Sequence, residues 1–525
     1  MRTKKNETFS SGALKLTIAG LVVRLMGFAN RIFMSNLIGS EGMGLYQLTF
    51  PVYSLIILTL TSGVSVTVSG LTAKYKASGR LKECKRSALA GFVVLLVSGT
   101  VCGALMAAFA RPLATYVLGD SRTALSIALL SPCIPIVASA SALKGYFYGM
   151  SRVTPTAISQ ITEQVVRIAF IFIFAGVIAG KDLENACAII TLSSAVGEMA
   201  NLLVVAVAFA LEKRSENNIE NYRKLPETSF GKEAAGIVKS SLPVSAGRFV
   251  TSMIGTVEAI ILPGRFLKGG LNYTASLSML GKLSGMAMPL ITFPTVVTSA
   301  MATTLVPAIS SALSTGNIKL ARERISKSIT LSFTMGFLFF GVFSVFGVPL
   351  GALLFPGEKV GVLLQEMSVF CLLLYLQQTL TGILNGLDKQ TQSLVSTLAG
   401  SAVRLGFLWV AVPVWGVDGY IAGMLAGSAL SCGISLLCVV KCTKMPFEPI
   451  KWVIFPAIPA LSAAALGEIA VKSFPFLGEN IVLMGLCLCL CGILWFFIMF
   501  LTGQLNFYGK YGRMKNNCDG LCRRK

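Results

Sequence analysis

Histidine is absent from the 525 residues of this chain, and charged residues of either sign are scarce. Without histidine, the chain lacks the commonest metal ligand and the commonest proton-transfer group of enzymes. Charged residues make up 13% of the sequence and hydrophobic residues 54%, whereas a soluble domain carries about 25% charged residues. These shortages argue against a soluble enzyme and indicate a protein whose main solvent is lipid.

Acidic residues are scarcer still, 23 against 45 basic ones, which gives a formal net charge of +22. Such a charge can indicate nucleic-acid binding. Here, however, the Lys and Arg residues gather in alternate loops between apolar segments. This is the positive-inside distribution of a membrane protein. It predicts that both termini are cytoplasmic, and that nucleic acid is not a partner.

The thirteen cysteines do not suggest a metal site or a disulfide framework. Most lie in apolar segments, where cysteine behaves as a small hydrophobe. Cys487, Cys489 and Cys491 follow a period of two, which scatters them around a helix. Cys518 and Cys522 in the C-terminal tail lack the further ligands that a zinc site needs. We therefore predict no metal and no cofactor.

Apolar segments long enough to cross a bilayer follow one another along the whole chain. A spanning helix needs roughly 20 mostly apolar residues. Fourteen segments meet this requirement, and they centre on residues 11–37, 45–73, 88–110, 122–147, 154–180, 184–211, 237–265, 280–312, 325–352, 360–385, 391–413, 417–440, 450–472 and 481–502. Arg24 and Arg31 interrupt the apolar core that a cleavable signal peptide would need. We expect a multi-pass protein of the cytoplasmic membrane whose first helix is retained.

Part of the sequence is repeated at an offset of 237 residues. The equivalent positions include Gly145 and Gly382, Gly149 and Gly386, Arg167 and Arg404, and Lys82 and Lys319. Each copy follows an even number of spans, so the two repeats should be parallel and related by an axis along the membrane normal. The predicted fold is therefore all-α, with about 14 transmembrane helices. Two parallel six-helix repeats form lobes around a central cleft, and two further helices follow them.

The repeat predicts a division of the chain into four parts. Residues 1–211 form the N-terminal lobe, 212–236 a polar cytoplasmic linker, and 237–440 the C-terminal lobe. Residues 441–525 contain the two extra helices and a basic cytoplasmic tail. Two lobes facing each other across a cleft are suited to transport by alternating access.

Several arginines lie inside the apolar segments, where a charge is costly unless it faces a partner or a wet cavity. Arg24 and Arg31 are seven residues apart and share one helical face. Alignment of the first spans of the two repeats places Arg31 opposite Glu258, and Arg248 one turn from the equivalent of Arg24. Guanidinium groups match phosphate oxygens. We predict that Arg24, Arg31 and Arg248 face a substrate phosphate, with a structural Arg31–Glu258 ion pair as the alternative.

Another group of intramembrane charges is predicted to be structural. Arg167 and Arg404 are equivalent in the repeat, which suggests the same task in each lobe. Glu163 precedes Arg167 by four residues and shares its helical face. We expect these three residues to fix the packing of their own bundles.

Three acidic residues are candidates for gating or for loading a coupling ion. Glu198 and Glu258 lie inside spans, where a proton or Na⁺ could load a carboxylate. Glu41 lies in the first external loop, between the glycines of Gly39-Ser-Glu-Gly-Met-Gly44, which permit tight turns. An ordinary solvated loop charge is the alternative for Glu41.

The N-terminal part of the chain resembles a known family of transporters. The resemblance is carried by Arg24-Leu-Met-Gly-Phe-Ala-Asn30-Arg31, by the Gly39–Gly44 loop and by Leu71-Thr-Ala-Lys-Tyr. These stretches look like the stage V sporulation protein B group of polysaccharide transporters, in the multidrug/oligosaccharidyl-lipid/polysaccharide exporter superfamily. Lipid II flippases belong to the same superfamily, and two extra C-terminal helices are typical of them.

This resemblance implies a flippase that moves an undecaprenyl-diphosphate-linked saccharide, a lipid II-type peptidoglycan precursor for the cell wall, across the cytoplasmic membrane. The sporulation group implies a role in the spore cortex. Arg24 matches a cavity arginine of lipid II flippases. Asn30-Arg31 departs from the family, because relatives often carry arginine and then aspartate there. Leu55-Ile-Ile-Leu58 also lacks the arginines that relatives place in the second helix.

Two other transport functions are alternatives: a multidrug or cation exporter of the same superfold, and a flippase for an O-antigen, teichoic acid or exopolysaccharide unit. A cation pocket needs acids facing the cleft, and the first span offers none. An enzyme is not expected, because the longest external segment, 266–281, contains neither acid nor histidine, and no Gly-rich phosphate loop is present. We predict a monomer that interacts with a lipid-linked oligosaccharide and membrane lipids. Its transport would be driven by the membrane potential, H⁺ or Na⁺.

Overall fold

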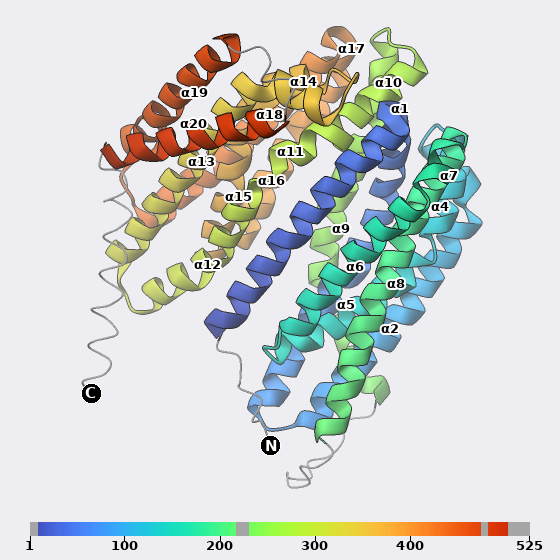
Figure 1. Ribbon diagram of the computed structural model, residues 1–525. Helices are drawn as coiled ribbons and strands as arrows, with labels where there is room; N and C mark the ends of the chain where they lie inside the picture. The colour runs from blue at the N-terminus through green and yellow to red at the C-terminus, as the bar shows by residue number, and fades with distance from the viewer. Residues whose placement is uncertain (1–8, 217–229, 474–480, 502–525) are drawn as a thin grey trace. The chain divides into compact units, whose positions relative to one another are not determined.

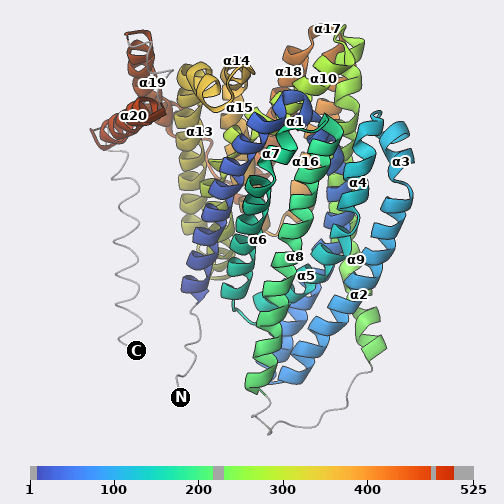
Figure 2. The ribbon, with the colours of Figure 1, turned by 45° about the vertical axis from the view of Figure 1, so that its right-hand side comes forward.

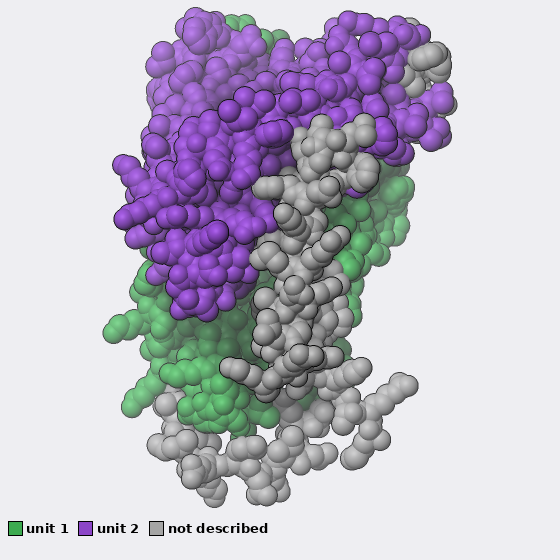
Figure 3. All heavy atoms as spheres, turned by 90° about the vertical axis from the view of Figure 1, so that its left-hand side faces the viewer, with its two compact units in different colours: residues 1–286 green, residues 287–525 purple. Residues whose placement is uncertain are grey.

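The computed structural model describes residues 9–216, 230–473 and 481–501, and the regular elements in these ranges are all helices (Figure 1). The middle of the predicted linker and the basic tail, with Cys518 and Cys522, lie outside the described residues. The chain divides into two compact units, Met1–Met286 and Ala287–Lys525, which Figure 3 colours separately. The all-α prediction is confirmed.

Unit 1 contains the helices up to α10. They are α1 (Phe9–Ala77), α2 (Leu81–Ala108), α3 (Ala110–Pro112), η1 (Leu113–Val117), η2 (Ser121–Thr123), α4 (Ala124–Leu130), α5 (Cys133–Gly149), α6 (Thr154–Ile173), α7 (Ala175–Ala179), α8 (Leu183–Glu216), α9 (Phe230–Lys268) and α10 (Tyr273–Leu280). The π-helix η3 (Gly281–Ala287) ends the unit and reaches the first residue of the next.

Unit 2 contains the remaining helices. They are α11 (Met288–Thr292), α12 (Thr295–Ser314), α13 (Ile318–Leu354), α14 (Val360–Glu366), η4 (Met367–Val369), α15 (Phe370–Gly386), α16 (Gln390–Val410), α17 (Val412–Trp415), α18 (Val417–Thr443), η5 (Ile450–Ile454), α19 (Phe455–Ser473) and α20 (Ile481–Leu501).

Twelve helical stretches among the described residues are long and apolar enough to cross a membrane, and Val482–Ile498 in α20 is a shorter apolar helix. One of the twelve is α1, whose 69 residues would form a straight helix of about 100 Å, roughly three times the thickness of the hydrocarbon core. Gly39 divides α1 into two spans. With α1 counted as two, the helices follow the order of the fourteen predicted segments.

Gly39 breaks α1 because its backbone has φ 65° and ψ −174°, a conformation that glycine adopts without steric cost. The first part of α1 rises from the N-terminal end of unit 1 to the top of the view, whereas α2 begins at the bottom (Figures 1 and 2). The chain therefore reverses direction within α1. We call the end of unit 1 at Gly39 the kink end.

The sequence repeat is also a repeat of packing. A Cβ atom added at Gly145 of α5 would lie 2.7 Å from the carbonyl oxygen of Ser65 in α1. In unit 2, a Cβ added at Gly382 of α15 would lie 3.0 Å from the carbonyl oxygen of Ala302 in α12. The following glycines repeat this arrangement: Gly149 contacts Ser69, and Gly386 contacts Val306. Adding 237 to the residue numbers of each pair in unit 1 gives the corresponding pair in unit 2. Equivalent helices therefore pack in the same way in the two units.

The compact units divide the chain at Met286, and not at the predicted linker, because α9 packs along the second part of α1. Thr256 donates a hydrogen bond to the carbonyl oxygen of Pro51, 3.0 Å away. A Cβ added at Gly63 would lie 2.3 Å from the carbonyl oxygen of Ser241. Unit 1 thus contains the first helix of the second repeat. The boundaries of the repeat-based lobes stay predictions.

Candidate functional site

At the kink end, α1 crosses α10 and η3 with backbone against backbone. A Cβ added at Gly44 would lie 2.0 Å from the carbonyl oxygen of Leu277, and a Cβ added at Gly281 would lie 2.0 Å from the carbonyl oxygen of Ser40. Gly44 and Gly281 differ by 237 residues, and so do Ser40 and Leu277. The contact is therefore reciprocal, as expected for two equivalent segments that meet at a pseudo-two-fold axis. We call these four residues the glycine crossing.

Beside the glycine crossing, a backbone carbonyl holds two side chains of α1. The carbonyl oxygen of Ser284 accepts hydrogen bonds from Nε2 of Gln47, at 2.6 Å, and from a terminal nitrogen of Arg31, at 3.3 Å. Ser284 lies in the π-helix η3, and π-helical segments are frequent at functional sites. Gln47 and Ser284 are again 237 residues apart. Arg31 is thus tied to the segment that contains the crossing.

A cluster of charged residues fastens the same end of the unit. Arg122 in η2 donates hydrogen bonds to Oδ2 of Asp120, at 2.8 Å, and to Oε1 of Glu41 in α1, at 2.9 Å. The hydroxyl of Tyr273 in α10 donates to the carbonyl oxygen of Gly119, at 3.4 Å. We call Glu41, Asp120 and Arg122 the kink-end clamp. The structure thus places Glu41, a predicted gating residue, in an ion pair.

Replacing Arg122 with alanine is expected to lower the free energy of unfolding by about 1–2 kcal/mol, because Asp120 and Glu41 lose their cation and Asp120 is buried. Thermal melting of the purified protein measures the effect. Arg111→Ala is the control, since that side chain is exposed. Equal melting of Arg122→Ala and the parent chain would show that the clamp contributes nothing.

A second network joins α6 to α8. A terminal nitrogen of Arg167 lies 2.9 Å from Oε1 of Glu163 and 4.0 Å from Oε1 of Glu198. Nδ2 of Asn201 donates to Oε2 of Glu163, at 2.9 Å, and to Oε2 of Glu198, at 3.1 Å. These four residues form a closed ring, which we call the charge ring. Its charged members have 13–20% of their side chains exposed, and Asn201 is 1% exposed.

The charge ring has a counterpart position in unit 2, identified by a glycine. A Cβ added at Gly197 of α8 would lie 3.0 Å from the carbonyl oxygen of Glu163. A Cβ added at Gly427 of α18 would lie 2.5 Å from the carbonyl oxygen of Gly400. Gly400 is the equivalent of Glu163 at the offset of 237. Gly427 is therefore the equivalent of Gly197.

This correspondence shows that the two units differ in charge around the same arginine. Ser428 follows Gly427 as Glu198 follows Gly197, and Gly400 stands in the place of Glu163. Arg404 of unit 2 donates a hydrogen bond to the hydroxyl of Ser401, at 3.1 Å. The arginine is repeated, whereas neither glutamate of the charge ring is. The predicted structural role of Arg167, Glu163 and Arg404 stays a prediction.

The other predicted residues lie on α1 and α9. Arg24 and Arg248 have exposed side chains, and Glu258 is half-buried. An exposed arginine within a membrane span must face a water-filled space or reach a headgroup. A guanidinium has five N–H donors, so the contact of Arg31 with Ser284 is compatible with a phosphate-facing role. That role, and the alternative pair of Arg31 with Glu258, stay predictions.

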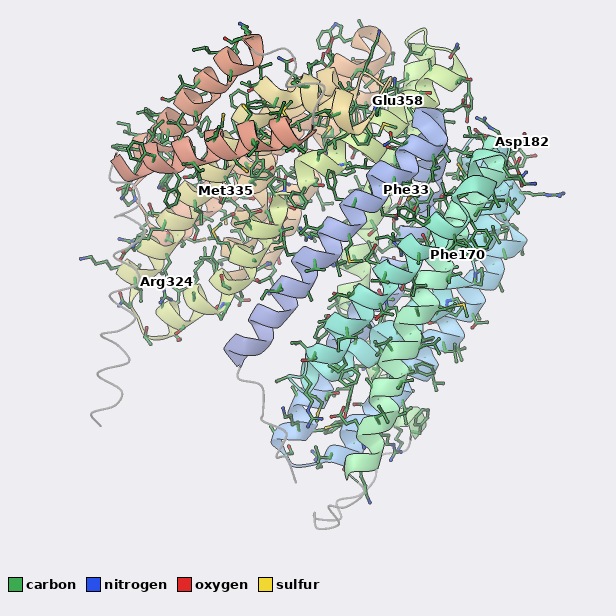
Figure 4. The ribbon with its side chains drawn as sticks, in the orientation of Figure 1. Phe33, Phe170, Asp182, Arg324, Met335 and Glu358 are labelled. Atoms are coloured by element: carbon green, nitrogen blue, oxygen red, sulfur yellow. The ribbon has the colours of Figure 1, made fainter. Side chains whose placement is uncertain are left out.

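Aromatic packing holds the Arg31 region of α1 against α6. The ring of Phe33 stacks on that of Phe172 with centroids 4.2 Å apart. Figure 4 marks Phe33 on α1 and Phe170 on α6, with Asp182 toward the kink end. The stacking fixes the helix that carries Arg31 next to the helix that carries Arg167.

Sequence reasoning missed three side chains of these networks, namely Gln47, Asn201 and Arg122. Gln47 could have been found, because the offset of 237 connects it with Ser284. Asn201 lies three residues after Glu198 and so shares its helical face. Arg122 follows an apolar segment and precedes another, and no sequence pattern marks it as a partner of Glu41.

Comparison with known proteins agrees with the fold. Residues 9–313 match the model of a family described as polysaccharide biosynthesis protein. The chain is 30% identical over 429 residues to the stage V sporulation protein B of Bacillus subtilis (strain 168), which covers 81% of this chain and 82% of that protein. It is 24% identical over 443 residues to the lipid II flippase MurJ of the same organism, covering 79% and 81% of the two chains.

Among solved structures, an inward-facing multidrug resistance transporter of the MATE family, in the MOP superfamily, superposes with a TM-score of 0.62 at 15% identity. The match covers 83% of this chain and all of that one. At this identity the likeness shows the fold, which is that of a membrane transporter. The family match spans more than half of the sequence, and the chain therefore belongs to the polysaccharide biosynthesis protein family of multi-pass membrane transporters.

Proposed function

We propose that this protein is a flippase that moves an undecaprenyl-diphosphate-linked saccharide of the lipid II type across the cytoplasmic membrane. The observation that carries the proposal is the exposure of Arg24 and Arg248 within the membrane-spanning helices α1 and α9. Exposed guanidinium groups at this depth suit a diphosphate, which accepts bidentate hydrogen bonds. The relative named lipid II flippase supports this cargo, and the relative named stage V sporulation protein B supports a role in sporulation.

Alternating access requires each end of the transport path to close in turn, and the kink end provides the contacts for one closure. The positive-inside distribution supports a cytoplasmic position for both termini, and on that basis the proposal assigns the kink end to the outer side. In this assignment the glycine crossing and the kink-end clamp are the closed outer gate. Glu41 holds the gate through Arg122, and the gate opens when the crossing separates.

The membrane potential is proposed as the driving force. A negative interior contributes about 2.3 kcal/mol per charge per 100 mV, and this field would act on the intramembrane arginines Arg24 and Arg248 that are proposed to hold the substrate. We expect flipping to stop when the potential is dissipated by an ionophore, as followed by the appearance of substrate in the outer leaflet. Coupling to H⁺ or Na⁺ through Glu198 or Glu258 is the alternative. Continued flipping at zero potential, combined with arrest by removal of the H⁺ or Na⁺ gradient, would favour that alternative.

Depletion and rescue in cells test the proposed cargo. The chain is depleted, and the lipid II that is accessible on the outer leaflet is measured before and after re-expression. Loss of accessible lipid II on depletion, and its return on rescue, are expected. Unchanged lipid II together with export of lipophilic cations would identify a multidrug exporter instead. Unchanged lipid II with loss of another lipid-linked saccharide would change the cargo within the same mechanism.

A further inference from the structure

Two cysteines lie one helical turn apart near the C-terminal end of α18. The sulfur atoms of Cys438 and Cys442 are 3.9 Å apart. Cys442 is exposed and Cys438 is half-buried. A metal–sulfur bond is about 2.3 Å long, so one ion can reach two sulfurs that lie up to about 4.6 Å apart. The two thiols are therefore close enough to bind the same ion.

Comparison of the two units shows what stands at the position of Cys442 in unit 1. Gly427 of α18 is the equivalent of Gly197 of α8, at an offset of 230 residues, and both helices continue unbroken beyond these glycines. At this offset Cys442 is the equivalent of Glu212. Glu212 is buried and forms an ion pair with Arg152. Unit 2 thus has a thiol where unit 1 has a paired carboxylate.

The cation of that ion pair is repeated as well. Lys389 is the equivalent of Arg152 at the offset of 237. Each of the two follows a residue with positive φ, which is 56° at Ser151 and 58° at Asp388. The positive charge of Lys389 acts on the sulfur of Cys438. The cysteine pair therefore lies next to a basic side chain, as the carboxylate of unit 1 does.

We propose that Cys438 and Cys442 form a binding site for a soft monovalent metal ion of the Cu(I) type. Thiolates select soft ions such as Cu(I). A structural Zn²⁺ takes four ligands, whereas the described part of the chain contains no group of three or more side chains that could hold a metal. Cu(I) is satisfied by two sulfurs. The site is separate from Arg24 and Arg248, and it does not rest on the proposed function.

The lysines around the pair balance the charge of such a complex. Binding replaces two thiol protons by one Cu(I), so the two thiolates and the ion together carry one negative charge. The last turn of a helix bears a partial negative charge of its own, which disfavours an anion. The charges of Lys389 and Lys441 act on Cys438, and Lys444 caps the helix. These basic residues also support a cytoplasmic position for this end of α18, where thiols stay reduced.

Spacing alone does not distinguish this pair from other cysteines. Cys487 and Cys491 of α20 are also four residues apart and interact with each other, but the sequence of α20 contains no charged residue. We predicted no metal from the sequence, because cysteines in apolar segments behave as small hydrophobes. The equivalence of Cys442 with Glu212 becomes visible only when α8 and α18 are aligned by their packing.

Uptake of Cu(I) by the purified full chain tests the proposal. The protein is reduced, and Cu(I) is supplied as its bicinchoninate complex with ascorbate, so that binding to single thiols is not counted. The parent chain is expected to take up one equivalent. Cys438→Ser with Cys442→Ser should lose that equivalent. Cys487→Ser with Cys491→Ser is the matched control, which has the same spacing without the lysines, and it should leave uptake unchanged.

Two further measurements sharpen the outcome. Lys389→Gln should still bind one equivalent, with an affinity lower by about fivefold, because one of the balancing charges is lost. Lys268→Gln, a change at an exposed lysine of unit 1, should bind as the parent chain does. In the parent chain, one equivalent of Cu(I) should protect Cys442 from a thiol reagent, as followed by mass spectrometry of its peptides.

The proposal is overturned if the parent chain takes up no Cu(I), or if Cys438→Ser with Cys442→Ser takes up as much as the parent. Loss of uptake in Cys518→Ser with Cys522→Ser would also overturn it, because the site would then need more than two sulfurs. If a serine variant does not fold, labelling decides, and Cys442 left unprotected by Cu(I) contradicts the site. None of these measurements requires flipping, so a wrong cargo would leave them unaffected.

Discussion

Alanine at Gly281 is expected to reduce flipping by about 100-fold or more. Its Cβ would lie 2.0 Å from the carbonyl oxygen of Ser40 and 2.6 Å from the backbone nitrogen of Gly44. Both neighbours are backbone atoms, so relief requires the helices to separate. Overpacking of this kind costs about 1–3 kcal/mol or more, and it falls on the closed state of the proposed outer gate. The variant should fold, but its gate should remain open.

Two measurements check this expectation. Flipping is followed in the depletion and rescue assay, and the state of the gate by labelling Ser278→Cys with a thiol reagent that does not cross the membrane. Labelling should increase when Gly281→Ala is added. Because the crossing is reciprocal, Gly44→Ala should have the same effect. Gly70→Ala is the control on α1, since a Cβ there meets no atom within 4 Å. Full flipping by Gly281→Ala would show that the crossing does not need to close.

The spans and the repeat could be predicted because they depend on one-dimensional patterns. Hydropathy marks the helices, and the glycines at 145 and 382 mark contacts in which a side chain would collide with a backbone. The reversal of α1 at Gly39 could also be anticipated from the glycines around Glu41. Each of these features appears as a pattern of residue types along the sequence.

The contacts of Arg31 could not be predicted in the same way. Its partner is the backbone carbonyl of Ser284. Every residue has a backbone carbonyl, so the sequence does not mark the one that accepts this hydrogen bond. The alignment that placed Arg31 opposite Glu258 used a different offset from the 237 that connects Gln47 with Ser284. One pair of the charge ring could be predicted from the sequence, because Glu163 and Arg167 share a helical face. The approach of Glu198 from α8 depends on the packing of two helices.

Replacing Arg24 and Arg248 together with alanine is expected to lower flipping by about 100-fold or more. A hydrogen bond between charged groups contributes about 1.5–3 kcal/mol, and two such contacts to a diphosphate would be lost. Both side chains are exposed, and thermal melting of the purified variant checks that it is folded. Binding of lipid II to the purified protein should weaken in parallel with flipping.

The lysine variants distinguish a phosphate clamp from a simple need for positive charge. Lysine offers a point charge without the planar pair of donors that fits a phosphate. If the diphosphate is held by bidentate contacts, Arg24→Lys with Arg248→Lys should flip more slowly than the parent chain and faster than the alanine pair. Arg111→Ala, a change at an exposed arginine near the end of a span, should leave flipping unchanged. If the alanine pair flips substrate as fast as the parent chain, Arg24 and Arg248 do not contact the substrate during transport.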